Sequence, residues 1–219
     1  YLHFALLTDF RDSKEEVMPD DNELLDQAKK GIESLNKKYA MGRNNLFFLF
    51  HRSRSWNPKE NRWMGYERKR GKLMQFNAFL RDHRNNQFST IVGDTTILSE
   101  VKYVITLDTG TQLPHETAWK LIATMAHPLN HPEFDEKKNI VTKGYGILQP
   151  RMGISLVSSQ SSLYASYFSG DSGVDPYTRA VSDVYQDIFG EGSFIGKGIY
   201  DVDAFERALA GRFPENKIL

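Results

Sequence analysis

The sequence contains no cysteine. Disulfide frameworks, thiolate zinc sites and cysteine nucleophiles are therefore excluded, and a reducing compartment is compatible with the composition. No stretch approaches the roughly 20 consecutive apolar residues of a membrane-spanning helix, so we expect this chain not to cross a bilayer itself. A net charge is also missing, because 28 basic side chains balance 28 acidic ones. The chain as a whole therefore has no basic field that would attract nucleic acid.

The sequence does contain enough apolar material for a buried core. Of its 219 residues, 40% are hydrophobic and 12% are aromatic, which argues against bulk disorder. We expect one domain over residues 1–219. The chain begins inside an apolar run without an initiator methionine, and it stops without a terminal element. From this we expect a piece of a longer protein, truncated at both ends.

Strand-like apolar runs alternate with helical patterns, which predicts an α/β fold with a mostly parallel sheet. Strands are expected at residues 2–8, 45–50, 101–107 and 144–149. Helices are expected after residues 20–22, near residue 71, after residue 114 and over 176–189, while 158–169 is expected to be a loop or short helix. A last helix is expected to begin with the capping box Asp203 to Glu206 and to end at Gly211.

Two of the predicted strands end on a carboxylate. Asp9 follows the first and Asp108 the third. Such a carboxylate can simply cap the next helix, but ligands of open α/β sheets bind beyond the carboxyl ends of strands. A pair of strand-end carboxylates favours a nucleotide with a divalent cation: one holds ribose or base, and the other holds Mg²⁺ or Mn²⁺.

Charge is distributed unevenly along the chain. Residues 1–30 hold eight acidic and four basic side chains, whereas residues 51–84 hold ten basic and three acidic ones. The basic segment is either a solvated helix face or a phosphate site. Because Trp56, Trp63 and Tyr66 are interleaved with it, a site for single-stranded nucleic acid is a further alternative.

Glycines cluster near the end of the chain, over residues 190–198. They allow the backbone to approach a ligand closely, and Lys197 could neutralise a phosphate or contact a hydroxyl. A flexible connection is the alternative. The spacing differs from that of a P-loop.

Seven segments, in order along the chain, resemble the glycosyltransferase region of cyclic β-1,2-glucan synthases. They are residues 2–10, 63–73, 103–108, 125–130, 144–151, 175–187 and 190–203. The resemblance implies a GT-A-like domain, without its first strand, from a multidomain synthase at the cytoplasmic face of a bacterial inner membrane. The implied reaction is an inverting transfer of glucose from UDP-glucose to a growing β-1,2-glucan, with Mg²⁺ or Mn²⁺ offsetting charge on the departing UDP.

The resemblance also implies roles for individual residues. The donor-binding residues are Asp9, Gly71, Lys72 and Asp108, and the acceptor-side residues are Gln149, Arg151, Gly196 and Lys197. Asp108 is also the implied metal ligand. The family pattern there is Asp-Ala-Asp-Thr, whereas this chain has Gly110 in place of the second carboxylate, so weak metal affinity is expected.

The catalytic base is expected in a Ser-His-Asp segment beyond Leu219, with Glu191 as a weak candidate within the chain. The chain alone is therefore expected to be inactive. Its expected partners are UDP-glucose, the glucan acceptor and the remaining domains of the synthase, but not nucleic acid. Two alternatives stay open: a cellulose- or chitin-type synthase, and a non-catalytic nucleotide- or nucleic-acid-binding module using residues 51–84.

Overall fold

The structure, a computed structural model, describes residues 2–39, 46–82, 87–150, 160–168, 188, 194 and 196–209. The chain divides into two compact units, which are treated separately below. Unit 1 is described over residues up to 101, and unit 2 over residues 102–209. Within these described ranges, no helix is both long and apolar enough to cross a membrane.

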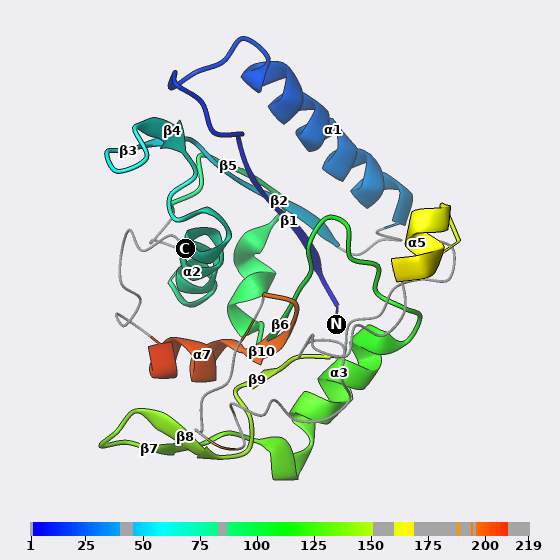
Figure 1. The fold of residues 1–219 in the computed structure, drawn as a ribbon. Helices are drawn as coiled ribbons and strands as arrows, with labels where there is room; N and C mark the ends of the chain where they lie inside the picture. Colours follow the sequence, from blue (N-terminus) through cyan, green and yellow to red (C-terminus); the bar gives the residue numbers. More distant parts are fainter. Residues whose placement is uncertain are drawn as a thin grey trace. The chain divides into compact units, whose positions relative to one another are not determined.

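Unit 1 is built on a three-stranded sheet with the order β1-β2-β5 (Figure 1). Strand β1 (Phe4–Asp9) runs parallel to β2 (Phe47–Arg52), and the helix α1 (Asp21–Tyr39) lies between them in the chain. Strand β5 (Thr90–Val92) pairs antiparallel with the other edge of β2. In the parallel register Asp9 is paired with Arg52, so the carboxyl ends of both strands meet at one edge of the sheet.

The core of unit 1 lies on both faces of β2. Phe48, Leu49 and Phe50 are fully buried, as expected for an apolar strand that is covered on both sides. The ring of Phe50 packs edge-on against Phe76 and Phe79 of helix α2 (Arg68–Arg81), at centroid distances of 5.1 and 5.3 Å. Helix α1 packs against β2 as well. Unit 1 also contains the hairpin β3 (Ser55–Asn57) and β4 (Arg62–Met64), and the 3₁₀ helix η1 (Thr95–Glu100).

Unit 2 contains a second three-stranded sheet, with the order β6-β10-β9. Strand β10 (Gly198–Asp201) is central and fully buried, and it runs antiparallel to both β6 (Tyr103–Thr106) and β9 (Ile147–Leu148). Unit 2 also contains α3 (Thr117–Ala126), η2 (Pro128–Asn130), the hairpin β7 (Glu133–Asp135) and β8 (Ile140–Lys143), α5 (Leu163–Phe168) and α7 (Val202–Leu209).

Among the described strands, the pairing differs from the mostly parallel sheet that the sequence predicts. Only β1 and β2 pair in parallel, and the other described pairings are antiparallel. The sequence prediction considered only the alternating strand–helix units, and it did not include β10 or the hairpins. Whether the complete domain is GT-A-like stays a prediction.

Two local predictions are corrected. Helix α7 begins at Val202, and its cap is Asp201, whose Oδ1 accepts from the backbone N–H of Ala204 at 3.0 Å, so the cap lies two residues before the predicted Asp203. On α1, helical spacing predicts an apolar face made of Leu24, Leu25, Ala28, Ile32 and Leu35, but of these only Ile32 is buried and Leu24 is 51% exposed. Gly211 and nearly all of the predicted helix 176–189 lie outside the described residues.

Candidate functional site

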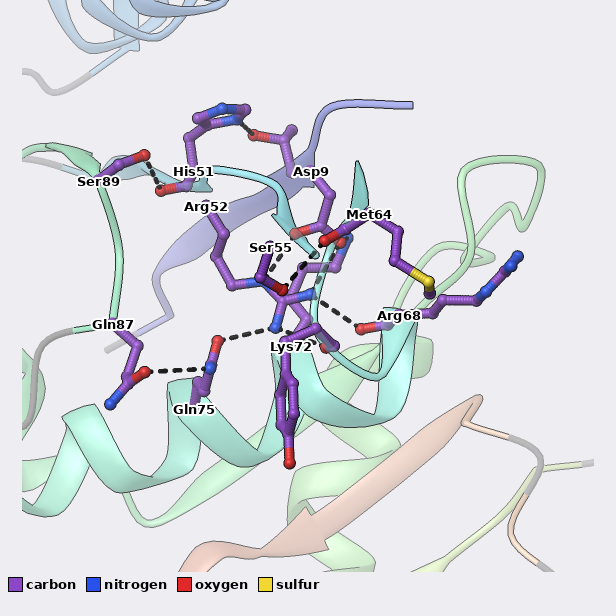
Figure 2. Close-up of polar contacts among 12 residues, drawn as sticks. Asp9, His51, Arg52, Ser55, Met64, Arg68, Lys72, Gln75, Gln87 and Ser89 are labelled. Atoms are coloured by element: carbon purple, nitrogen blue, oxygen red, sulfur yellow. Dashed lines mark hydrogen bonds and ion pairs between the residues drawn. The ribbon is translucent and has the colours of Figure 1, made fainter. Parts of the chain in front are cut away.

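The carboxyl ends of the two parallel strands in unit 1 form a compact ionic cluster. Arg52 binds Asp9 in a bidentate pair, with Nε to Oδ1 at 2.6 Å and Nη2 to Oδ2 at 3.0 Å. Lys72, from the first turns of α2, places its Nζ 2.9 Å from Asp9 Oδ2. The cluster of Asp9, Arg52 and Lys72 thus brings together two of the predicted donor-binding residues, Asp9 and Lys72 (Figure 2).

The electrostatics of this cluster favour an anion. Burial by itself raises the pKa of the Asp9 carboxyl, but hydrogen bonds from Arg52 and Lys72, and their charges, outweigh burial and lower the pKa below its usual value. Asp9 is therefore ionised at neutral pH and is flanked by two cations. The three groups together carry one excess positive charge, which can offset part of the charge of a phosphate.

Asp9 keeps some capacity for a further contact. A carboxylate has about four acceptor positions, and the contacts from Arg52 and Lys72 occupy three of them. Its side chain is 15% exposed, so the remaining position can be reached by a hydroxyl or an N–H of a ligand.

Two glycines allow this cluster to form. A Cβ at Gly65 would lie 2.7 Å from Asp9 Cγ and 3.0 Å from Arg52 Nη2, so the ion pair packs directly on that backbone. A Cβ at the predicted site residue Gly71 would lie 2.1 Å from the carbonyl oxygen of Tyr66, which itself accepts from Arg52 Nη1 at 3.0 Å. Gly71 thus supports the site by making room for the backbone that holds Arg52.

A pocket of about 280 Å³ adjoins the cluster. It is lined by Arg52, Ser53, Ser55, Tyr66, Gln75 and Gln87. Its position beyond the carboxyl end of β2 is where open α/β sheets bind ligands. Arg52, Gly65 and Gln75 were not predicted as site residues. Arg52 lies two residues beyond the predicted strand 45–50, and its place at the end of β2 is visible only in the structure.

The opposite face of β2 carries a buried histidine. His51 Nδ1 lies 2.9 Å from Thr8 Oγ1, and its ring meets Phe10 edge-on at 4.2 Å. Its Nε2 is buried and has no hydrogen-bond partner within the described part of the chain. Burial lowers the pKa of His51, which therefore stays neutral at pH 7. Figure 2 shows its ring pointing away from Gln75 and Gln87, so it does not line the pocket.

Ion pairs offset part of the positive charge of the basic segment 51–84. Its arginines meet carboxylates both from the acidic beginning of the chain and from within the segment itself. The pairs are Arg52 with Asp9, Arg54 with Asp21, Arg62 and Arg68 with both Asp12 and Glu60, and Arg70 with Glu67. Asp9, Asp12 and Asp21, which lie outside the segment, offset three of its seven excess positive charges, so the ion pairs alone do not exclude the phosphate or nucleic-acid alternative.

Unit 2 brings together a second group of predicted residues. In the register of β6 and β10, Gly198 is opposite Thr106, and Lys197 Nζ lies 3.2 Å from Asp108 Oδ2. Gly198 lets β10 approach β9 closely, because a Cβ there would lie 2.4 Å from the carbonyl oxygen of Leu148. Lys197 is therefore the predicted acceptor-side residue that contacts Asp108, while Gln149 directly follows β9 and Gly196, with a φ of +78°, lies two residues before β10 at the same end of the sheet. Arg151 and Glu191 lie outside the described residues.

The described residues do not fit a divalent metal. No three His, Asp or Glu side chains among them are placed to hold an ion. Asp108 is paired with the ammonium of Lys197, and a Cβ at Gly110 would meet no atom within 4 Å, so the space of the missing carboxylate is open. The Mg²⁺ or Mn²⁺ implied by the resemblance stays a prediction, and none of the chemistry below depends on it.

Comparison with known proteins identifies one relative along the entire chain. No protein-family model matches. The chain is 46% identical, over all 219 of its residues, to the cyclic beta-(1,2)-glucan synthase NdvB of Rhizobium meliloti (strain 1021), and it spans 8% of the length of that protein. The resemblance that the seven segments indicate is therefore confirmed, and the chain is homologous over its whole length to a segment of a cyclic β-1,2-glucan synthase.

Proposed function

We propose that this chain supplies the donor site of an inverting glucosyltransferase that moves glucose from UDP-glucose to a growing β-1,2-glucan. The observation that carries the proposal is the cluster of Asp9, Arg52 and Lys72 at the carboxyl ends of β1 and β2, beside a pocket. The 46% identity to a β-1,2-glucan synthase favours this product over that of a cellulose- or chitin-type synthase. The complete synthase then works at the cytoplasmic face of a bacterial inner membrane.

In the proposed reaction, an acceptor hydroxyl attacks the anomeric carbon of the donor glucose from the face opposite UDP. A bond forms between the acceptor oxygen and this carbon, while the bond from the carbon to the β-phosphate oxygen breaks, and UDP leaves with the electron pair. The hydroxyl proton passes to a general base. No described residue is given the role of that base. The proposal therefore assigns donor binding to this chain, and not the complete transfer.

Lys72 and Asp9 have distinct tasks in this proposal. Lys72 moves its ammonium toward the diphosphate, where negative charge grows as the glycosidic bond breaks. Asp9 accepts from a hydroxyl or N–H of the nucleoside through its remaining acceptor position, and Arg52 holds Asp9 in place throughout. In unit 2, Lys197 and Gln149 are the proposed contacts for the acceptor glucan.

Calorimetric titration of the 219-residue chain with UDP and UDP-glucose tests the proposal. Wild-type protein is expected to bind both ligands, and Lys72→Met and Asp9→Asn are each expected to weaken binding about tenfold or more, because each removes a charge-assisted contact. Lys29→Met is the matched control, because Lys29 pairs with Asp26 on the exposed side of α1. Absence of UDP binding, or equal binding by wild type and both site variants, would contradict the donor-site assignment.

A further inference from the structure

Every hydrogen-bond donor of the Arg52 side chain is in use. Nε and one N–H of Nη2 bind Asp9, and the second N–H of Nη2 binds the carbonyl oxygen of Arg68 at 3.1 Å. The two N–H groups of Nη1 bind the Tyr66 carbonyl oxygen at 3.0 Å and Gln75 Oε1 at 2.7 Å. With a side chain that is 3% exposed, Arg52 is a fixed group that can only donate.

This fixed donor sets the orientation of the Gln75 amide. Gln75 lies on α2, and its Oε1 must face Arg52, because the flipped amide would place its own N–H groups against those of the guanidinium. The Gln75 Nε2 therefore points away from Arg52, and it donates to Gln87 Oε1 at 3.3 Å, an exposed contact (Figure 2). As a result, Gln75 keeps a second N–H on Nε2 that can donate to a ligand in the pocket that it lines.

The pocket suits one flat, polar ring. Its volume of about 280 Å³ lies at the lower limit of ordinary ligand pockets and leaves room for a nucleobase. The aromatic ring of Tyr66, a residue that is 39% exposed, borders it and can stack on such a ring. The positively charged ends of Lys72 and Arg52 lie beside it, where a diphosphate attached to the ring would extend.

We propose that Gln75 is the residue that selects uracil over cytosine in this pocket. Its Nε2 donates to the 4-carbonyl oxygen of uracil, whereas cytosine carries an amino group at that position and would set donor against donor. A site built around such a bond rejects the analogue that cannot form it. This inference rests on the proposed donor function, and it adds the base specificity of the same site.

Wild-type protein gives the first test, by competition between UDP and CDP measured by calorimetry. The two ligands share ribose and diphosphate, so their affinity ratio isolates the base. We expect at least about a tenfold preference for UDP. Equal affinity for UDP and CDP overturns the role of Gln75 and leaves the donor site standing, whereas binding of neither overturns the donor site itself.

The variant Gln75→Glu gives the second test. The introduced carboxylate still accepts from Arg52, but it offers an acceptor to the pocket, so the UDP-to-CDP affinity ratio is expected to fall about tenfold or more. Gln87→Glu is the matched control, because it adds the same charge to the same pocket and leaves the Gln75 donor in place. A ratio unchanged in Gln75→Glu, or reduced equally by Gln87→Glu, contradicts the proposal. If Gln75→Glu fails to fold, Gln75→Met, which removes the donor without adding a charge, is expected to lower the same ratio, and an unchanged ratio contradicts the proposal.

Discussion

Replacing Arg52 by methionine is the sharpest perturbation of unit 1. The substitution leaves the Asp9 carboxylate, which is 15% exposed, with Lys72 as its remaining cation. It also removes the donor from two backbone carbonyl oxygens and from Gln75 Oε1. Breaking a buried ion pair by removing one partner typically costs about 3–5 kcal/mol, so we expect a loss of this size in the free energy of unfolding of unit 1 at pH 7.

The pH dependence of that loss follows from Asp9. Because Arg52 and Lys72 lower the pKa of Asp9 in the folded protein, unfolding takes up a proton only between the folded and unfolded pKa values. The pair therefore stabilises fully above the unfolded value of about 3.9. The contribution disappears as the pH falls through the lower, folded pKa. The difference between wild type and Arg52→Met should therefore be large at pH 7, nearly unchanged at pH 5.5, and smaller near pH 3.

The difference in unfolding free energy between wild type and Arg52→Met is measured within unit 1 by urea unfolding, monitored through the hydrogen exchange of the β1 and β2 amides. Arg54→Met is the control, because Arg54 forms a comparably buried pair with Asp21 on other elements. Both variants should lose stability. UDP affinity is measured under conditions where both variants stay folded, and only Arg52→Met should show a loss of it. Exposed ion pairs typically contribute less than about 1 kcal/mol. A loss of that size for Arg52→Met would refute the argument that Arg52 is buried with all of its hydrogen-bond donors occupied.

Three further predictions test separate features. Gly65→Ala should lower the stability of unit 1 by about 1–3 kcal/mol, because its Cβ would lie 2.7 Å from Asp9 Cγ. Gly31→Ala on α1, where a Cβ meets nothing within 4 Å, should stabilise by about 0.5–1 kcal/mol, and thermal unfolding that ranks these two variants the other way would contradict the packing. Gly110→Asp should raise Mn²⁺ affinity in calorimetry, since the position has space for a carboxylate near Asp108, and unchanged affinity would remove that position from any metal site. His51 should titrate below pH 6.5 by NMR, because burial lowers its pKa, and a normal midpoint would contradict its burial. The free energy of unfolding should fall as the pH drops below 6.5, because the unfolded chain then binds a proton that the buried ring excludes.

The sequence predicted the apolar strands and the carboxylates at their ends. The first strand ends at Asp9, as β1 does, because an uninterrupted apolar run followed by a charge is a strong local signal. Asp108 lies two residues beyond β6, which is close to the predicted position. Helices α2 and α3 likewise lie where their apolar spacing placed them.

The parts that the sequence did not predict depend on contacts between distant residues. Strand β10 lies at the end of a glycine-rich stretch with little strand propensity, and it is stabilised by pairing on both edges with β6 and β9. The role of Arg52 depends on partners 14 to 43 positions away in the sequence, which no local pattern encodes. Its conspicuous feature in the sequence, a place within a basic segment, indicated a solvated or ligand-binding charge rather than a buried one.

The central claim is that the end of the β1–β2 pair binds the nucleotide of the sugar donor. Assigned ¹H–¹⁵N NMR spectra of the 219-residue chain, recorded during a UDP titration, test it most directly. The account predicts saturable shifts at the side-chain signals of Arg52 and Gln75 and at the backbone amides of Asp9, Tyr66 and Lys72, and it predicts that these shifts are absent in Asp9→Asn. Saturable shifts confined to other residues, or no shifts at all, would contradict the account.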